Sequence, residues 1–167
     1  MRFRGTVYRA HNPQWSWDPL SGEGARRHGG RFNRPGIPSL YTSLSPLAAI
    51  REAEPLGRPM QPLVLCAYEV DVETVFDARN RTSRDSMSVN TAELACPAWE
   101  AEMHAGAVPA SQALADRLVK AGYVGMLVRS LAAGSGTDDI NLVLWNWGPG
   151  YPSRVILIDD EGRLSRG

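Results

Sequence analysis

Two kinds of hydrophobic periodicity along the chain predict a mixture of strands and helices. Alternation of apolar and polar positions, or a short run of β-branched residues, is typical of β-strands. Such patterns predict six strands, over Phe3–Arg9, Ser39–Thr42, Pro62–Val72, Gly122–Arg129, Asn141–Trp147 and Arg154–Ile158. Because strands outnumber helical segments, the sequence predicts an α+β fold with a strand-rich core.

Helical periodicity is clearest directly after Ser45–Pro46, which has the composition of an N-cap followed by proline at the first helical position. The next segment, Leu47–Glu54, carries apolar residues on one arc at about 100° per residue. This arc consists of Leu47, Ala49, Ile50 and Ala53. Spaced leucines predict a second helix over Ser111–Lys120, ending before Gly122, and a weaker pattern predicts a third over Pro97–His104.

Two stretches lack convincing periodicity. The first, between the first strand and Tyr41, contains Trp15, Trp17 and the glycine-rich segment Gly22–Arg31. Loops of this length in compact domains are usually functional or disordered, and the tryptophans argue against disorder. The second, Arg79–Asn90, is polar and predicts a surface excursion. Since no repeat, linker or composition boundary interrupts the chain, we expect a single domain over residues 1–167.

Charge and hydropathy exclude several classes of protein. The 18 basic and 18 acidic side chains cancel, which argues against direct binding of nucleic acid. No run of apolar residues is long enough to span a bilayer, so no membrane association is expected. Because Met1–Gly5 also lacks the apolar stretch of a signal peptide, we expect a cytoplasmic location.

The cysteines and histidines carry no recognisable site. Cys66 lies in an apolar run and is expected to be a buried thiol, and Cys96 has no histidine in a catalytic partner motif. The histidines, His11, His28 and His104, are scattered without ligand spacing, so no metal is expected. Two cysteines are too few for a disulfide framework in a chain of this length.

The glycine-rich segment does not fit a known nucleotide-binding motif. Gly22 and Gly24 are followed by Arg27 where the Rossmann fingerprint requires a third glycine. We expect the segment neither to follow a strand nor to open a helix, and the phosphate site of that fold needs a helix N-terminus. The chain also lacks a P-loop and the Gly-x-Ser-x-Gly elbow of serine hydrolases, so the fold is predicted not to be a Rossmann fold.

Three residues are candidates for chemistry when they are considered together. The glycines before Arg31 allow close approach of the backbone to a ligand, and the arginine suits bidentate binding of a pyrophosphate. Glu52 borders the predicted apolar arc beside Ala49, which directs its carboxylate toward a cleft. Taken singly, such an arginine or glutamate is commonly a surface residue, and Tyr41 is commonly a core aromatic. The residues alone therefore leave the function open.

A resemblance narrows this choice. The segments that carry it are YR at Tyr8–Arg9, GGRFN at Gly29–Asn33, LYTS at Leu40–Ser43, SPLAAIRE at Ser45–Glu52, and Val124–Ser130 followed by Asn141–Trp145. In this order they resemble the RES-domain family, which is named for its Arg, Glu and Ser. The similarity covers nearly the whole chain, and the succession of motifs is more specific than any one of them.

The resemblance implies a fold and an activity. Family members resemble toxins of bacterial toxin–antitoxin pairs, whose partner carries an Xre-like helix-turn-helix portion. Their fold is similar to that of ADP-ribosyltransferase toxins, a split β-core with flanking helices that binds NAD+ without a Rossmann unit. They consume NAD+ as a substrate, without a metal, by transferring ADP-ribose to a protein acceptor or by releasing it to phosphate or water.

The same resemblance assigns roles to residues. Arg31, Glu52 and Ser130 match the family arginine, glutamate and serine, and Ser135 is the alternative for the serine if the register is shifted. Tyr41 matches a tyrosine expected to stack on nicotinamide. Further contacts with NAD+ are expected from Tyr8, Arg9 and Asn33. The catalytic set is therefore predicted to be Arg31, Tyr41 and Glu52.

Two questions remain open in the sequence. A protein acceptor, which we slightly favour, needs a docking face, and a phosphate acceptor needs a second basic pocket. The tryptophans available for docking are Trp15, Trp17, Trp145 and Trp147, and the arginines available for phosphate are Arg26, Arg27 and Arg51. The rival functions are a non-catalytic nucleotide-binding module and an RNA-cleaving toxin, which the zero net charge disfavours.

Overall fold

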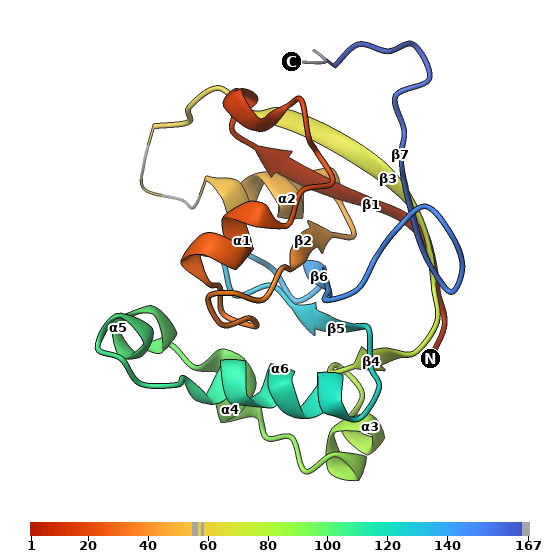
Figure 1. Ribbon diagram of the computed structural model, residues 1–167. Coiled ribbons are helices and arrows are strands. Elements are labelled where there is room, and N and C mark those ends of the chain that lie inside the picture. The colour runs from red at the N-terminus through yellow and green to blue at the C-terminus, as the bar shows by residue number, and fades with distance from the viewer. Residues whose placement is uncertain (55–56, 58, 165–167) are drawn as a thin grey trace.

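The computed structural model describes residues 1–54, 57 and 59–164 (Figure 1). The strands are β1 (Phe3–His11), β2 (Leu40–Ser43), β3 (Val64–Val72), β4 (Val75–Asp77), β5 (Gly125–Arg129), β6 (Ile140–Leu144) and β7 (Ser153–Leu157). The helices are α1 (Glu23–His28), α2 (Pro46–Ala53), α3 (Arg81–Ser86), α4 (Thr91–Ala95), α5 (Trp99–His104) and α6 (Ala110–Lys120), with a 3₁₀ turn at Pro13–Trp15. Among these helices, none combines the length and the apolar character needed to span a bilayer.

The strands form one mixed sheet in the order β4-β5-β6-β2-β1-β3-β7. Strands β4 and β5 are parallel, and the other neighbours are antiparallel. At the centre, β1 meets β2 only where Tyr8 lies opposite Ser43, within the residues that the structure describes. By contrast, β1 and β3 pair along their full length. The sheet therefore opens into two halves between β1 and β2, and the predicted α+β fold with a split β-core is confirmed.

Two apolar layers hold the sheet in place. Along β5 and β6, successive side chains point to opposite faces, as the two-residue period of a strand requires. Leu127 and Leu142 belong to one buried cluster, with β1, β3 and β7. Met126 and Val143 belong to the other, with Leu114 of α6. Figure 1 shows the corresponding layer of helices, α3 to α6, lying along one side of the β4–β5 half.

Helix α2 packs closely on the sheet because small residues form its buried face. The Ser45 hydroxyl accepts a hydrogen bond from the amide of Ala48 at 3.2 Å, which is the predicted N-cap. Ala48 and Ala49 are buried, whereas Leu47 is 63 % exposed. The predicted apolar arc is therefore wrong at Leu47. This packing brings the last turn of α2, which contains Glu52, to the opening between β1 and β2.

The six predicted strands and three predicted helices are all present, with their ends shifted by a few residues. The sequence missed four short elements, β4, α1, α3 and α4, because segments of six residues or fewer carry little periodicity. Two descriptions of irregular segments are corrected. The glycine-rich segment does open a helix, α1, directly after Gly22, and the stretch Arg79–Asn90 contains α3.

Candidate active site

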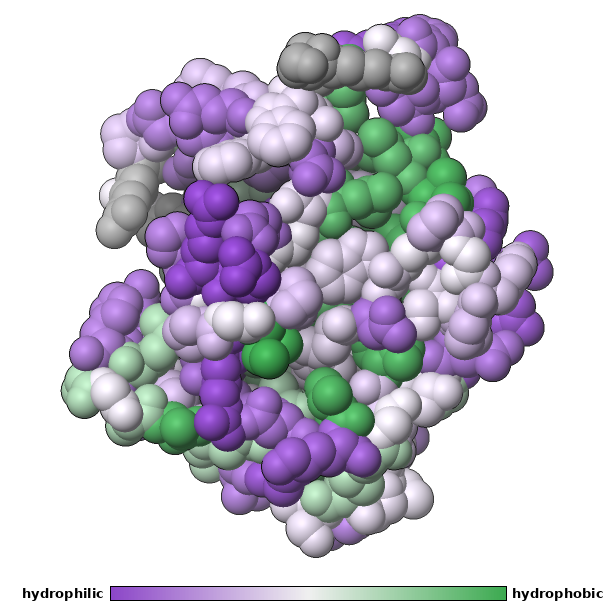
Figure 2. Space-filling model, viewed as in Figure 1, coloured by the Kyte–Doolittle hydropathy of each residue, from purple (hydrophilic) through white to green (hydrophobic). Residues whose placement is uncertain are grey.

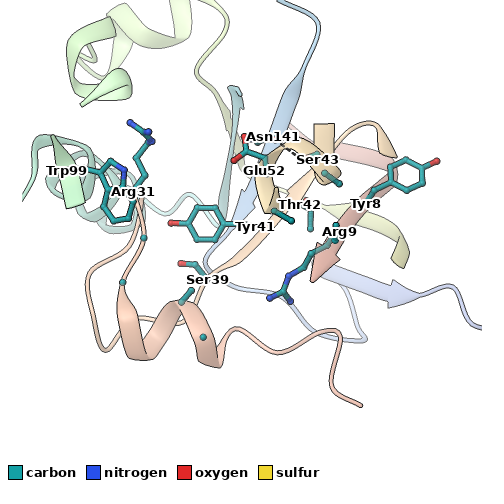
Figure 3. A pocket seen from close by; sticks show the side chains of 17 residues that line it. Tyr8, Arg9, Arg31, Ser39, Tyr41, Thr42, Ser43, Glu52, Trp99 and Asn141 are labelled. Carbon is teal, nitrogen blue, oxygen red and sulfur yellow. Dashed lines mark hydrogen bonds between the residues drawn. The ribbon is translucent and has the colours of Figure 1, made fainter. Parts of the chain in front are cut away.

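A cavity of about 480 Å³ lies where the two halves of the sheet separate (Figure 3). Its walls come from β1, β2, the last turn of α2, and the loop that joins α1 to β2. The polar and aromatic side chains in these walls are Tyr8, Arg9, Arg31, Ser39, Tyr41, Thr42, Ser43, Glu52, Trp99 and Asn141. A cavity of this size is in the usual range for small-molecule sites. The structure thus brings Arg31, Tyr41 and Glu52, which come from a loop, strand β2 and helix α2, into one cavity.

One oxygen of the Glu52 carboxylate is held by two donors. Both the Ser130 hydroxyl and the Asn141 side-chain amide donate to Oε1, each at 2.5 Å. Among the described residues, no hydrogen bond reaches Oε2. Hydrogen bonds to an ionised carboxylate are about twice as strong as neutral ones. The clamp therefore fixes the carboxylate while the second oxygen stays available in a cavity wall.

The orientation of the Asn141 amide is itself fixed. The Ser43 hydroxyl donates to Asn141 Oδ1 at 2.7 Å, and this leaves Nδ2 directed at Glu52. Ser43 and Asn141 lie directly opposite each other on β2 and β6. Figure 3 shows these side chains together with Glu52 on one side of the cavity. We name Glu52, Ser130, Asn141 and Ser43 the Glu52 cluster.

The loop that carries Ser130 is folded around Asp139. The backbone amide of Ser130 donates to the Asp139 carbonyl at 2.7 Å, and the amide of Gly136 donates to its carboxylate at 2.9 Å. Arg51 forms an ion pair with the same carboxylate at 2.6 Å. The Gly136 amide is the largest cause that lowers the pKa of Asp139; burial opposes it and Arg51 adds to it. Ser135, the alternative for the family serine, lies in the same loop. Its hydroxyl is within hydrogen-bond distance of the Ser130 hydroxyl, at 2.7 Å.

Arg31 lies across the cavity, at the end of α4. Its Nη1 donates to the carbonyl oxygens of Ala95 and Cys96, and its guanidinium lies 6.0 Å from the ring centroid of Trp99. Burial lowers the pKa of Arg31, partly offset by the charge of Glu52. The group stays charged at neutral pH, because the ordinary pKa of a guanidinium is so high. Arg31 is thus a fixed positive charge facing the carboxylate.

Tyr41 is held by its hydroxyl, which leaves its ring in the cavity wall. The hydroxyl donates to Asn33 Oδ1 at 2.8 Å and accepts from the amide of Phe32 at 3.0 Å. Burial raises the pKa of Tyr41, so the phenol stays protonated. Gly30 packs directly against this arrangement: a Cβ there would lie 2.6 Å from the Tyr41 oxygen and 2.7 Å from Asn33 Oδ1. Here the second glycine of GGRFN is needed for space.

The three further residues expected to contact NAD+ lie in different places. Tyr8 and Arg9 line the cavity, and Figure 3 shows Tyr8 at the end away from Arg31. Asn33 is 2 % exposed and is not among the lining residues. Its amide donates to three backbone carbonyls and its oxygen accepts from Tyr41. In this structure Asn33 therefore supports Tyr41 from behind.

The residues considered for an acceptor are divided between core and surface. Trp145 is buried, whereas Trp15 and Trp17 are more than half exposed, with ring centroids 6.5 Å apart. Arg26 and Arg27 are both paired with Glu23, and Arg51 with Asp139 as described above. Figure 2 shows a strongly hydrophilic surface over α1. The three arginines suggested for phosphate are thus engaged in ion pairs.

Sequence reasoning missed Asn141, Asp139 and Trp99 as parts of this site. The signal for Asn141 was present: it is the polar residue in the otherwise apolar strand Ile140–Leu144. Asp139 lies in an irregular segment, and the weak helical pattern over Pro97–His104 gave no indication that Trp99 faces the cavity. Both cysteines are buried free thiols. Cys96 lies at the end of α4, and Cys66 lies on β3.

Comparison with known proteins gives two findings. A family model described as the RES domain matches residues 6–166. A chain in the crystal structure of the M. tuberculosis MbcT–MbcA toxin–antitoxin complex has a similar fold, with a TM-score of 0.62 and 22 % sequence identity. That similarity covers 95 % of this chain and 84 % of the other. No curated protein matches the sequence.

Proposed function

The chain belongs to the RES-domain family, and on this premise we propose that it is an enzyme that cleaves the nicotinamide–ribose bond of NAD+. The observation that carries the proposal is the Glu52 carboxylate. It is held at Oε1 by Ser130 and Asn141, and it lies in a cavity wall shared with Arg31 and Tyr41. A fixed carboxylate in a cavity of this size suits a reaction that develops positive charge on a bound sugar.

The chemistry follows from the bond that is broken. As the glycosidic bond to nicotinamide lengthens, the bonding electrons move to the pyridinium ring, which leaves as a neutral molecule. No proton donor is needed for this leaving group. The ribose becomes oxocarbenium-like, as in glycoside hydrolysis. Glu52 stabilises this cation through Oε2 and the ribose hydroxyls, because Oε1 is occupied by its two donors.

The other two residues bind and orient the substrate. Tyr41 offers a neutral aromatic face, on which the cationic nicotinamide ring stacks before the bond breaks. Arg31 anchors the ribose or the phosphate next to it with the nitrogens that the Ala95 and Cys96 carbonyls do not occupy. Tyr8 and Arg9 complete the substrate contacts from β1.

The same proposal includes a biological setting. We propose that the protein acts as the toxin of a toxin–antitoxin pair and is neutralised by an antitoxin with an Xre-like helix-turn-helix portion. Membership of the RES family supports this, as does the fold shared with a chain of the MbcT–MbcA toxin–antitoxin complex. For the acceptor we slightly favour a protein, for which the exposed Trp15 and Trp17 are candidate docking residues outside the cavity that contains Glu52. The ion-paired arginines offer less support for a phosphate acceptor.

The test is release of nicotinamide from NAD+ by purified protein, measured chromatographically for the wild type and for Glu52→Gln. This substitution keeps the shape of the side chain and removes its charge. We expect turnover to fall roughly 100- to 1000-fold, the usual effect of losing one preorganised electrostatic contact. Glu73→Gln is the matched control, because Glu73 is exposed and does not line the cavity.

Repeating the assay with phosphate, with cell lysate and with neither identifies the acceptor. Phosphate-dependent release indicates phosphorolysis, lysate-dependent labelling of protein indicates ADP-ribosylation, and release in buffer alone indicates hydrolysis. Ordinary activity in Glu52→Gln contradicts the mechanism. Binding of NAD+ without any release of nicotinamide favours the non-catalytic nucleotide-binding module instead.

A further inference from the structure

The Ser130 hydroxyl is occupied entirely by groups of the protein. A hydroxyl has one proton to donate and two lone pairs that accept. The Ser130 proton goes to Glu52 Oε1 at 2.5 Å, and its oxygen accepts from the amide of Ala132 at 3.2 Å. The Ser135 hydroxyl, 2.7 Å away, is the second donor to this oxygen, because the Ser130 proton is already used. Ser130 does not line the cavity that contains Glu52, so its effect on a substrate passes through Glu52.

One ion pair joins the loop that carries Ser130 to helix α2. Arg51 on α2 donates from Nη1 to Asp139 Oδ2 at 2.6 Å, across 88 residues of chain. Arg51 directly precedes Glu52 in the helix. The carbonyl of Asp139 accepts from the backbone amide of Ser130 at 2.7 Å. The pair therefore links the two ends of the Ser130–Glu52 hydrogen bond through the chain on either side of it.

The surroundings of this ion pair make it a firm link. The Asp139 side chain is 12 % exposed, and its Oδ2 also accepts from the amide of Gly136 at 2.9 Å. Ion pairs between exposed side chains contribute little, since solvent screens the charges and both side chains remain mobile. The Arg154–Glu69 pair between β7 and β3 is of that kind, with the Glu69 side chain 55 % exposed. Neither Arg51 nor Asp139 lines the cavity that contains Glu52, so neither is placed to contact a substrate.

We propose that Arg51 and Asp139 are positioning residues that keep the Ser130 hydroxyl on Glu52. This inference rests on the proposed function. If the pair is broken, the loop loses its link to α2, and Glu52 Oε1 loses a donor that fixes the carboxylate. A preorganised group lowers the barrier because its orientation is already set when the charge develops. The consequence therefore falls on kcat, whereas the groups that bind NAD+ keep their places.

The first test compares two substitutions that remove the charges of the pair. Asp139→Asn keeps the shape of the side chain, and Arg51→Met keeps most of its length. In each variant we expect kcat for nicotinamide release to fall roughly 10-fold, with the KM for NAD+ within about 2-fold, a smaller loss than in Glu52→Gln. Arg51→Lys, which keeps the charge, should recover part of kcat. Glu69→Gln is the control, because it breaks an exposed ion pair outside the cavity and should leave kcat and KM unchanged.

The second test separates positioning from general stability. If Asp139 acts through the Ser130 hydroxyl, its substitution matters little once that hydroxyl is gone. We therefore expect Asp139→Asn to lower kcat by less than about 2-fold in the Ser130→Ala background, compared with roughly 10-fold in the wild type. Equal losses in the two backgrounds overturn the inference, as do wild-type kcat values in Asp139→Asn and Arg51→Met.

Hydrogen exchange tests the link without NAD+. Amide exchange in the segment Ser130–Asp139, followed by mass spectrometry, should be roughly 10-fold faster in both variants than in the wild type, and exchange in β3 should be unchanged. Unchanged exchange in the loop overturns the inference. Arg51 is the more exposed partner, so Arg51→Met serves if Asp139→Asn does not fold. Absence of nicotinamide release by the wild type contradicts the proposed function alone, because the exchange experiment still reports on the link.

Discussion

The cavity that contains the Glu52 cluster adjoins a smaller cavity lined by His11, Arg9 and Gly24, which we name the His11 cavity. The polar side chains of the two regions differ in how they are hydrogen-bonded. In the Glu52 cluster, the side chains of Glu52, Ser130, Asn141 and Ser43 are joined by hydrogen bonds of 2.5 to 2.7 Å. Beside the His11 cavity, both ring nitrogens of His11 are buried and lack a hydrogen-bond partner among the described residues. A closed network fixes a reacting group before the substrate arrives. A buried polar group without a partner instead retains an unfavourable free energy.

The largest of the effects expected here comes from opening the Glu52 cluster. Asn141→Leu removes a donor from Glu52 Oε1 and leaves the Ser43 hydroxyl without its acceptor. We expect kcat for nicotinamide release to fall roughly 10- to 100-fold, less than in Glu52→Gln, because the carboxylate itself remains. Asn146→Leu is the control, since Asn146 is exposed just beyond β6. Equal activity in the two variants contradicts a positioning role for Asn141.

Alanine substitutions at two glycines test how tightly the chain packs around Tyr41 and beside the His11 cavity. In Gly30→Ala, the added Cβ meets Tyr41 and Asn33 at 2.6–2.7 Å, where the hydrogen bonds leave little room to move. We expect the free energy of unfolding to fall by about 1–3 kcal/mol, as is typical of overpacking. In Gly24→Ala, a Cβ meets nothing within 4 Å, and alanine favours helix α1.

Urea unfolding of both glycine variants measures this difference. Gly24→Ala should match or exceed the wild type in stability. If both variants lose the same free energy, the wall around Tyr41 is no tighter than the wall beside the His11 cavity.

The smallest effects are expected in the pH dependence of stability, which separates the two regions. The pKa of His11 is lowered in the folded state, so the unfolded chain binds the proton first as the pH falls. Stability from this group is therefore present above the unfolded pKa of 6.5 and is lost progressively as the pH falls below that value toward the lower folded pKa. Asp139 also has a lowered pKa, and its contribution is lost only below the unfolded value of 3.8.

Unfolding free energies measured between pH 7 and pH 2.5 check this assignment. His11→Phe should reduce the loss of stability between about pH 7 and pH 5, and Asp139→Asn should reduce the loss below about pH 4. Each variant should leave the other range unchanged. A change in the wrong range shows that the titrating group lies elsewhere.

Most of the secondary structure and part of the site were predictable because their signals are local. Periodicity in Phe3–Arg9 and Asn141–Trp147 and the Ser45–Pro46 cap act within a few residues, and they recovered β1, β6 and α2. The motifs placed Arg31 and Glu52 as candidates before any contact was known. Four elements of six residues or fewer, such as β4 and α4, escaped because so short a segment shows no clear period.

The sequence by itself determined the family, the order of most strands and helices along the chain, and the candidate site residues. Tertiary structure decided which of them meet. Ser130 and Asn141 reach Glu52 across 78 and 89 residues of chain, and Ser43 reaches Asn141 because the register of β2 on β6 sets them opposite. The burial of His11 also depends on tertiary structure, because segments distant in the sequence enclose the end of β1 and leave its ring nitrogens without a partner among the described residues. Such contacts depend on how the sheet halves and loops pack, and local sequence rules extend only over neighbouring turns and strands.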